Sequence, residues 1–136
     1  MADQKKLVQD AYAAFGRTDI PAIINSLTDD IDWHLLGPQE LPITGQRKGK
    51  PEVSRFFKQV GELWNFERFE PRQFIEQGDD VVVLGYYSGT AKGSGRKFAA
   101  EWAHVFTVKN GKIAKFREYT DTANLIAALN LTALRT

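Results

Sequence analysis

The segment EWAHVFTVKNGKIAKF, residues 101–116, restricts the fold more than any other part of the chain. Trp102, His104, Phe106 and Val108 occupy every second position, and an Asn-Gly pair then precedes another alternating run. A repeat of two places alternate side chains on opposite faces of a strand, and Asn-Gly is typical of tight hairpin turns. The sequence therefore predicts a β-hairpin with one apolar face, and His104 lies in the middle of that face.

The bulk composition is typical of one globular domain. Of the 136 residues, 43% are hydrophobic and 26% are charged, with a formal net charge of +1, so we expect a single domain over residues 1–136 with a sizeable core. Lysine and arginine are dispersed, which disfavours binding to nucleic acid or to a membrane surface. No signal peptide and no run as long as a membrane span is present. We therefore expect a cytoplasmic protein.

Cysteine and histidine usage also limits the chemistry. There is no cysteine, and the two histidines, His34 and His104, are far apart in sequence. This pattern provides neither a thiolate nucleophile nor the ligand spacing of a metal site. We expect neither a metal nor a cofactor.

Periodicity along the chain predicts the secondary structure. Helical stripes and caps are followed by alternating strands with Gly-containing turns, and Pro71 indicates an edge strand or a bulge. The expected helices cover 7–15, 18–27, 51–64 and 121–134, and the expected strands cover 30–37, 66–77, 80–91, 96–108 and 112–120. Helices that precede a run of strands are typical of the α+β class. A twisted sheet with helices on one face encloses a pocket.

The register of the hairpin has two possible solutions. A three-residue turn pairs His104 with Phe116, two positions from Glu118, so that all three side chains share one face. A two-residue turn instead pairs His104 with Arg117 and directs Lys115 toward the apolar side. We favour the first solution because an unpaired buried ammonium costs roughly several kcal/mol.

His104 and Glu118 are the candidate catalytic pair. An imidazole and a carboxylate in a wall of aromatic residues can transfer a proton near neutral pH, as proton abstraction beside a carbonyl group requires. The alternative is a buried His–Glu hydrogen bond that satisfies two polar groups and has no chemical role. The residues alone leave both interpretations open.

Three strings together resemble a known family over nearly the whole chain: AYAAFGRTDIPAIINSLTDDIDW, ITGQRKGKPEVSRFF and EWAHVFTVKNGKIAKFREYTD. They are similar to the SnoaL-like and ketosteroid-isomerase-like members of the nuclear transport factor 2-like superfamily. The resemblance implies a cone, in which a curved antiparallel sheet wraps around three helices and encloses a ligand cavity. It also implies a homodimer formed through the outer sheet face.

The resemblance to steroid isomerases does not extend to their catalytic residues. The two oxyanion positions fall at Ala11, beside Tyr12, and at His104, while the general-base and supporting-tyrosine positions fall at Leu35 and Phe57. None of the four is retained, so we do not expect steroid isomerisation. The SnoaL-like polyketide cyclases are a better match.

By resemblance to those cyclases, His104 on the penultimate strand pairs with the acid Glu118 on the last strand, and Asp121 is a secondary candidate. Either Tyr86 or Tyr87 should also face inward. The residues expected to line the pocket are Tyr12, Trp33, Leu35, Phe57, Trp102, Phe106 and Phe116.

Two functions follow as hypotheses. The first is an enzyme that binds an apolar or aromatic, carbonyl-bearing small molecule, with Glu118 as general base and His104 either polarising the substrate oxygen or orienting the base. Its reaction would be of the isomerase, cyclase or lyase type. The second is a non-catalytic dimeric binding or scaffold module, in which Ala103, Val105 and Thr107 on the outer face pack between two protomers.

Overall fold

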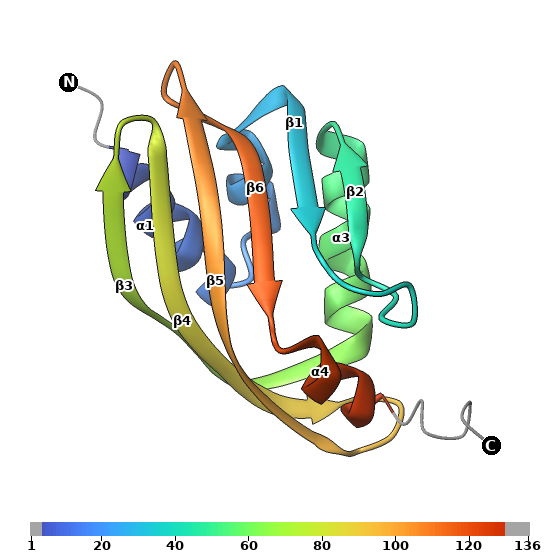
Figure 1. The fold of residues 1–136 in the computed structure, drawn as a ribbon. Helices are drawn as coiled ribbons and strands as arrows, with labels where there is room; N and C mark the ends of the chain where they lie inside the picture. The colour runs from blue at the N-terminus through green and yellow to red at the C-terminus, as the bar shows by residue number, and fades with distance from the viewer. Residues whose placement is uncertain (1–3, 130–136) are drawn as a thin grey trace.

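The computed structural model describes residues 4–129, which form four helices and one six-stranded sheet (Figure 1). The predicted α+β class is confirmed. The elements are α1 (Gln4–Gly16), α2 (Ile20–Asn25), β1 (Leu27–Leu35), β2 (Gly45–Lys48), α3 (Lys50–Leu63), β3 (Trp64–Gln77), β4 (Asp80–Ala91), β5 (Lys97–Lys109), β6 (Lys112–Thr120) and α4 (Thr122–Ala128). The predicted continuation of the last helix past residue 129 lies outside the described residues. Among those described, no helix has the length and apolar character needed to cross a membrane.

The strand order in the sheet is β2-β1-β6-β5-β4-β3, and the sheet differs from the prediction in two respects. The β1 and β6 strands are parallel, whereas the prediction was a purely antiparallel sheet. The β2 strand was also missed, because its four residues, Gly45–Lys48, have no apolar alternation and form an edge. Parallel partners lie far apart in the chain, so local periodicity cannot identify them.

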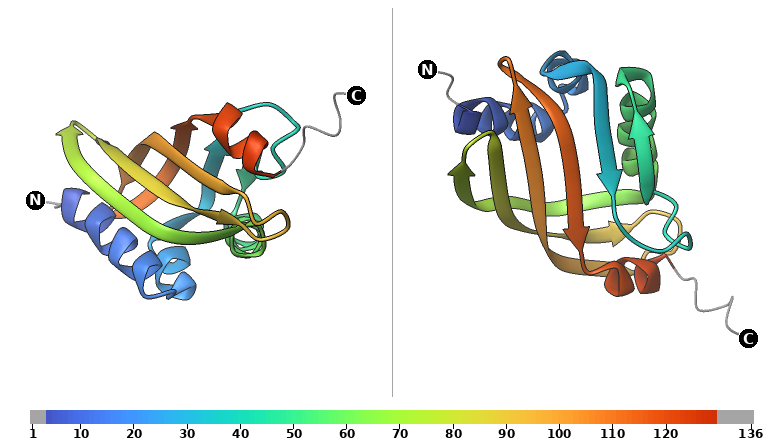
Figure 2. Two further views of the ribbon diagram at one scale, coloured as in Figure 1. Left: turned by 90° about the horizontal axis from the view of Figure 1, so that it is seen from below. Right: turned by 45° about the horizontal axis from the view of Figure 1, so that its top comes forward.

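The sheet is strongly curved, and α1, α2 and α3 lie against its concave face (Figures 1 and 2). The β3 and β4 strands are both curved (Figure 1), and their pairing shifts register between Phe66 and Arg68 and again between Pro71 and Gln73. Bulges of this kind bend a strand and increase its twist. The expectation that Pro71 marks an edge strand or a bulge is therefore confirmed. The α4 helix packs against β5 at one end of the sheet.

The core lies between the concave face and the helices. The predicted stripe on α3 is buried at Val53, Phe56 and Val60 and continues into Trp64 at the start of β3. Along β5, inward-facing residues from Phe98 to Val108 are buried at every second position. Both faces expected from the sequence are therefore the faces that the protein buries.

The β5–β6 hairpin combines parts of both predicted registers. Asn110 and Gly111 have positive φ values of 51° and 76°, so the turn contains two residues, as in the disfavoured solution. A bulge at Ala114 then moves the pairing by one further residue, and His104 lies opposite Glu118. Neither predicted register is correct, since both omitted the bulge.

The bulge restores the side-chain parity that the disfavoured register would have lost. Ile113 is buried next to the turn, whereas Lys115 is exposed on the outer face. The argument that Lys115 avoids the apolar interior therefore holds, although the protein achieves this with a bulge and not with a longer turn.

Candidate functional site

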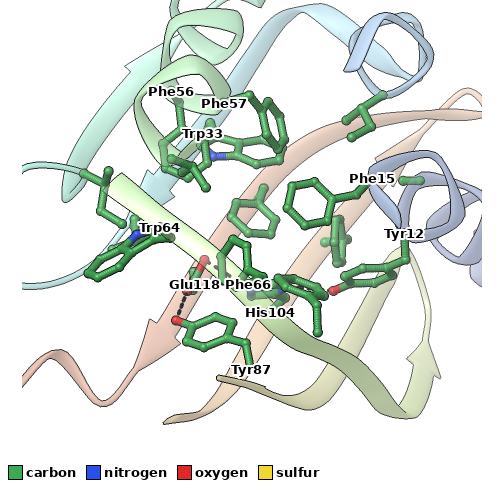
Figure 3. A pocket seen from close by; sticks show the side chains of 18 of the residues that line it. Tyr12, Phe15, Trp33, Phe56, Phe57, Trp64, Phe66, Tyr87, His104 and Glu118 are labelled. Atoms are coloured by element: carbon green, nitrogen blue, oxygen red, sulfur yellow. Dashed lines mark hydrogen bonds and ion pairs between the residues drawn. The ribbon is translucent and has the colours of Figure 1, made fainter. Parts of the chain in front are cut away.

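The concave face and the helices enclose an apolar cavity (Figure 3). Its volume is about 80 Å³, and one water molecule needs about 10–15 Å³ on a comparable measure. Among the described residues that line it, only four side chains other than the indole rings carry polar atoms, namely Tyr12, Tyr87, His104 and Glu118. The cavity therefore presents a few convergent polar groups in an aromatic wall, as expected of a small-molecule site.

His104 and Glu118 form the centre of this polar group. Their exposed fractions are 4% and 7%, and no other His, Asp, Glu, Lys or Arg among residues 4–129 is buried. The His104 Nε2 atom lies 3.2 Å from Glu118 Oε1, but its direction does not meet the geometry of a hydrogen bond. The imidazole and the carboxylate are therefore in close contact, but this contact is not a hydrogen bond between Nε2 and Oε1.

Tyr12 connects α1 to the imidazole. Its hydroxyl lies 2.6 Å from His104 Nδ1. Burial, and to a lesser extent the charge of Glu118, raises the pKa of Tyr12 well above its ordinary value, so the side chain is a neutral phenol. When this phenol donates to Nδ1, the neutral imidazole carries its hydrogen on Nε2. That tautomer avoids placing a nitrogen lone pair against the carboxylate.

Tyr87 binds the other side of the carboxylate. Its hydroxyl lies 2.7 Å from Glu118 Oε2 and 2.7 Å from Thr120 Oγ1. Burial is the main cause that raises the pKa of Tyr87 well above its ordinary value, followed by the charge of Glu118. Tyr87 is therefore a neutral hydrogen-bond partner of Oε2, whereas Oε1 accepts no hydrogen bond from any described residue.

Aromatic stacking fixes the imidazole in place. The Trp102 ring stacks on His104 with a centroid distance of 3.9 Å and an interplanar angle of 19°. Trp102 pairs with Gly85 on β4, and its ring occupies the space in which a Gly85 side chain would lie. Contrary to our expectation, Trp102 is not part of the cavity lining. It lies against His104 because the glycine opposite gives its ring room.

The other predicted lining residues do lie on the cavity wall, and they come from five elements. They are Tyr12, Trp33, Leu35, Phe57, Phe106 and Phe116. Of the two tyrosines considered, Tyr87 is the one that faces inward. Asp121 is exposed and outside the cavity, and its carboxylate accepts a hydrogen bond from the Asn124 amide at the start of α4. Its role in the structure is therefore that of a helix cap.

Several lining residues were not predicted from the sequence. Phe15 on α1 contacts Phe57, Phe66 and Phe69, with ring centroids 4.8 to 6.1 Å apart. The helical stripe that contains Phe15 was recognised, but the stripe does not reveal which helix faces the end of β3.

No group of three or more potential metal ligands occurs among the described residues.

The two buried phenols lead to a prediction about alkaline pH. We expect Tyr12 and Tyr87 to remain protonated in the folded protein when tyrosines of the unfolded chain ionise, at a pH of about 10. Because the pKa of both tyrosines is raised in the folded state, the contribution of their neutral hydroxyls to the free energy of unfolding is fully present below that pH and declines above it. The tyrosinate absorbance of the folded protein should lack the contribution of two of the four tyrosines. Ionisation of all four tyrosines before unfolding would contradict the burial of these hydroxyls.

Comparisons with solved structures place this site in a known fold. A protein of the nuclear transport factor 2-like type from Burkholderia thailandensis E264 is 32% identical, covers 95% of this chain and 98% of its own, and has a TM-score of 0.87. A similar protein of unknown function from Burkholderia pseudomallei K96243 is 31% identical over the same shares, with a TM-score of 0.85. TerC, crystallised with polyporic acid, is 26% identical over 93% of this chain and 98% of its own, with a TM-score of 0.84.

The comparison with curated proteins gave no match. The model of the SnoaL-like domain family matches residues 8–116, a range that includes most of α1, His104 and most of the cavity wall. The predicted resemblance is therefore confirmed, and the chain belongs to the SnoaL-like domain family.

Proposed function

We propose that this protein binds an apolar, carbonyl-bearing or aromatic small molecule and transfers a proton at the carbon beside its carbonyl group. One observation carries the proposal. Glu118 is a buried carboxylate in an aromatic cavity, and its Oε1 atom accepts no hydrogen bond within residues 4–129. An oxygen with this freedom can accept a proton from a bound molecule. The crystallisation of the relative TerC with polyporic acid also supports an organic ligand.

In the proposed reaction, Glu118 Oε1 takes a proton from the carbon beside the carbonyl group. The C–H electron pair moves into the C–C bond, and the carbonyl π pair moves to oxygen, which gives an enolate. Returning a proton to the same or a conjugated carbon completes an exchange or an isomerisation. The apolar wall excludes water and strengthens the interactions around the charge that develops.

His104 lies beside the proposed base. Its Nδ1 is bonded to Tyr12, whereas its Nε2 lies 3.2 Å from Glu118 Oε1 and has no hydrogen-bond partner among the described residues. Both roles considered from the sequence are compatible with these contacts: the imidazole can orient the carboxylate, and its Nε2–H can donate to the oxygen of a bound carbonyl group. The Trp102 stack holds the ring in this position.

Exchange of the acidic C1 protons of 2-tetralone in D₂O tests the proposal. This bicyclic ketone is apolar and aromatic, and proton NMR reports the loss of its C1 signal directly. We expect the protein to accelerate the exchange over buffer by about 10²-fold or more. Tetralin, which has the same rings but no carbonyl group, should inhibit the reaction by occupying the cavity. Absence of acceleration, although 2-tetralone binds, would contradict the catalytic proposal.

A specific feature of the outer face supports the second candidate, a non-catalytic dimeric module. Leu84, Ala103 and Tyr119 form one row across β4, β5 and β6, and Leu84 and Tyr119 are 38% and 44% exposed. Exposed apolar rows of this kind are typical of surfaces that pair with another protein. Binding of 2-tetralone without proton exchange would favour this candidate.

A further inference from the structure

The contacts of Glu118 raise the question of how a proton that it takes up returns to solvent. The carboxylate is buried, and a bound ligand would separate it from water in the cavity. Two hydrogen-bonded routes lead away from the carboxylate and the imidazole beside it. One route runs from His104 to Tyr12, and the other runs from Oε2 to Tyr87.

Only the second route continues toward the surface. The Tyr12 hydroxyl has no partner among the described residues other than His104. The Tyr87 hydroxyl lies 2.7 Å from Thr120 Oγ1 as well as 2.7 Å from Glu118 Oε2. Thr120 is half-buried at the end of β6, and the next residue, Asp121, is exposed. A continuous path of two hydroxyl groups therefore links the buried carboxylate to the rim of the sheet.

We propose that Tyr87 and Thr120 form a proton relay between Glu118 and solvent. When Glu118 is protonated, Oε2 gives its proton to the Tyr87 oxygen, Tyr87 gives its own proton to Thr120 Oγ1, and Thr120 releases its proton to water. Each hydroxyl breaks one O–H bond and forms another, so both stay neutral and Glu118 returns to a carboxylate. Uptake of a proton follows the same path in reverse after the two hydroxyls rotate.

The chemistry of the two hydroxyls suits this role. A phenol or an alcohol is both a donor and an acceptor, so it can pass a proton on without becoming charged. Burial of Tyr87 makes its ionised form unfavourable, which favours transfer through the neutral hydroxyl. The relay rests on the proposed function for the proton that it would carry, but the hydrogen bonds of the path are contacts within the protein itself.

The test compares Thr120→Val, which keeps the shape and removes the hydroxyl, with Thr120→Ser, which keeps the hydroxyl. In protein labelled with ¹³C at tyrosine Cζ, NMR in mixed H₂O and D₂O measures how fast the Tyr87 hydroxyl exchanges with solvent. We expect Thr120→Val to slow this exchange by about tenfold or more, and Thr120→Ser to restore it to within about twofold. The matched control is Thr107→Val, which removes a threonine hydroxyl bonded to Asp80 on the outer face.

A purely structural role for Thr120 gives a different result. If the contact of the Tyr87 hydroxyl with Thr120 is only structural, its loss in Thr120→Val would leave the exchange of the Tyr87 hydroxyl unchanged or make it faster, and either result would overturn the relay. Failure of Thr120→Ser to restore the exchange would do the same. If the wild-type protein does not accelerate the exchange of 2-tetralone, the proposed function fails, but the exchange of the Tyr87 hydroxyl in the free protein still tests the relay. If the wild-type protein does accelerate it, Thr120→Val should lower the incorporation of deuterium into 2-tetralone while the affinity for 2-tetralone stays unchanged.

Discussion

Replacement of Glu118 by glutamine is expected to reduce the exchange of 2-tetralone to nearly the rate in buffer. The amide has the shape of the carboxylate, and its oxygen can still accept the hydrogen bond from Tyr87, but it cannot take a proton from carbon. A positioned general base contributes about 10²- to 10⁴-fold, so a loss of this size is expected. Proton NMR of the C1 signal under identical conditions measures it.

Two comparisons isolate the chemical role of Glu118. Glu101→Gln makes the same change on the exposed outer face of β5 and should exchange 2-tetralone like the wild type. Binding of 2-tetralone to Glu118→Gln, followed through tryptophan fluorescence, should persist because the aromatic wall is unchanged. If Glu118→Gln exchanges the ketone at the wild-type rate, Glu118 is not the base.

The largest effect on stability is expected for Gly89→Ala. Gly89 on β4 lies opposite Phe66, and an added Cβ would overlap the backbone carbonyl oxygen of Asn65 and lie 2.9 Å from Phe66 Cα. These are backbone atoms of the paired strand, so the clash can be relieved only by separating β3 from β4. We expect a loss of about 3 kcal/mol or more in the free energy of unfolding. The thermal midpoint should fall by roughly 10 °C.

Gly61→Ala is the matched control, and its expected effect on the free energy of unfolding has the opposite sign. Gly61 lies in α3, and outside its own helix an added Cβ would meet no atom of the described residues within 4 Å. Alanine favours the helix over glycine by about 0.5–1 kcal/mol, so this variant should be slightly more stable than the wild type. Chemical denaturation of both variants measures the difference. A Gly89→Ala variant as stable as Gly61→Ala would show that β3 and β4 are not as close as described.

Much of the fold could be predicted from local patterns because most of its elements have a regular apolar repeat. The α3 stripe and the alternation along β5 each identified the buried face correctly. The pairing of Trp33 with Phe116 across β1 and β6 could not be predicted in this way. Strands with similar patterns can pair in several orders, and the choice depends on contacts between residues more than eighty positions apart.

The candidate site was predictable to the extent that it depends on side-chain parity. His104 and Glu118 face the same interior, as their positions in adjacent strands indicated. Their direct pairing depends on the bulge at Ala114, which the turn residues in the sequence do not predict. The hydrogen bond of Tyr87 to Glu118 could not be predicted from the sequence either, because it depends on the registers of β4, β5 and β6 together.

The parallel pairing of β1 with β6 has a consequence for how the protein folds during synthesis. The β1 strand leaves the ribosome early, but its central partner is the last strand of the sheet. Until residues 113–118 emerge, the β1–β2 hairpin cannot pair with β6. The edge and the apolar side chains of β1 that contact β6 in the folded protein therefore stay exposed. Contacts between such distant segments are slow to form. A nascent chain that stalls before β6 would therefore expose Trp33 and Leu35 to chaperones and proteases.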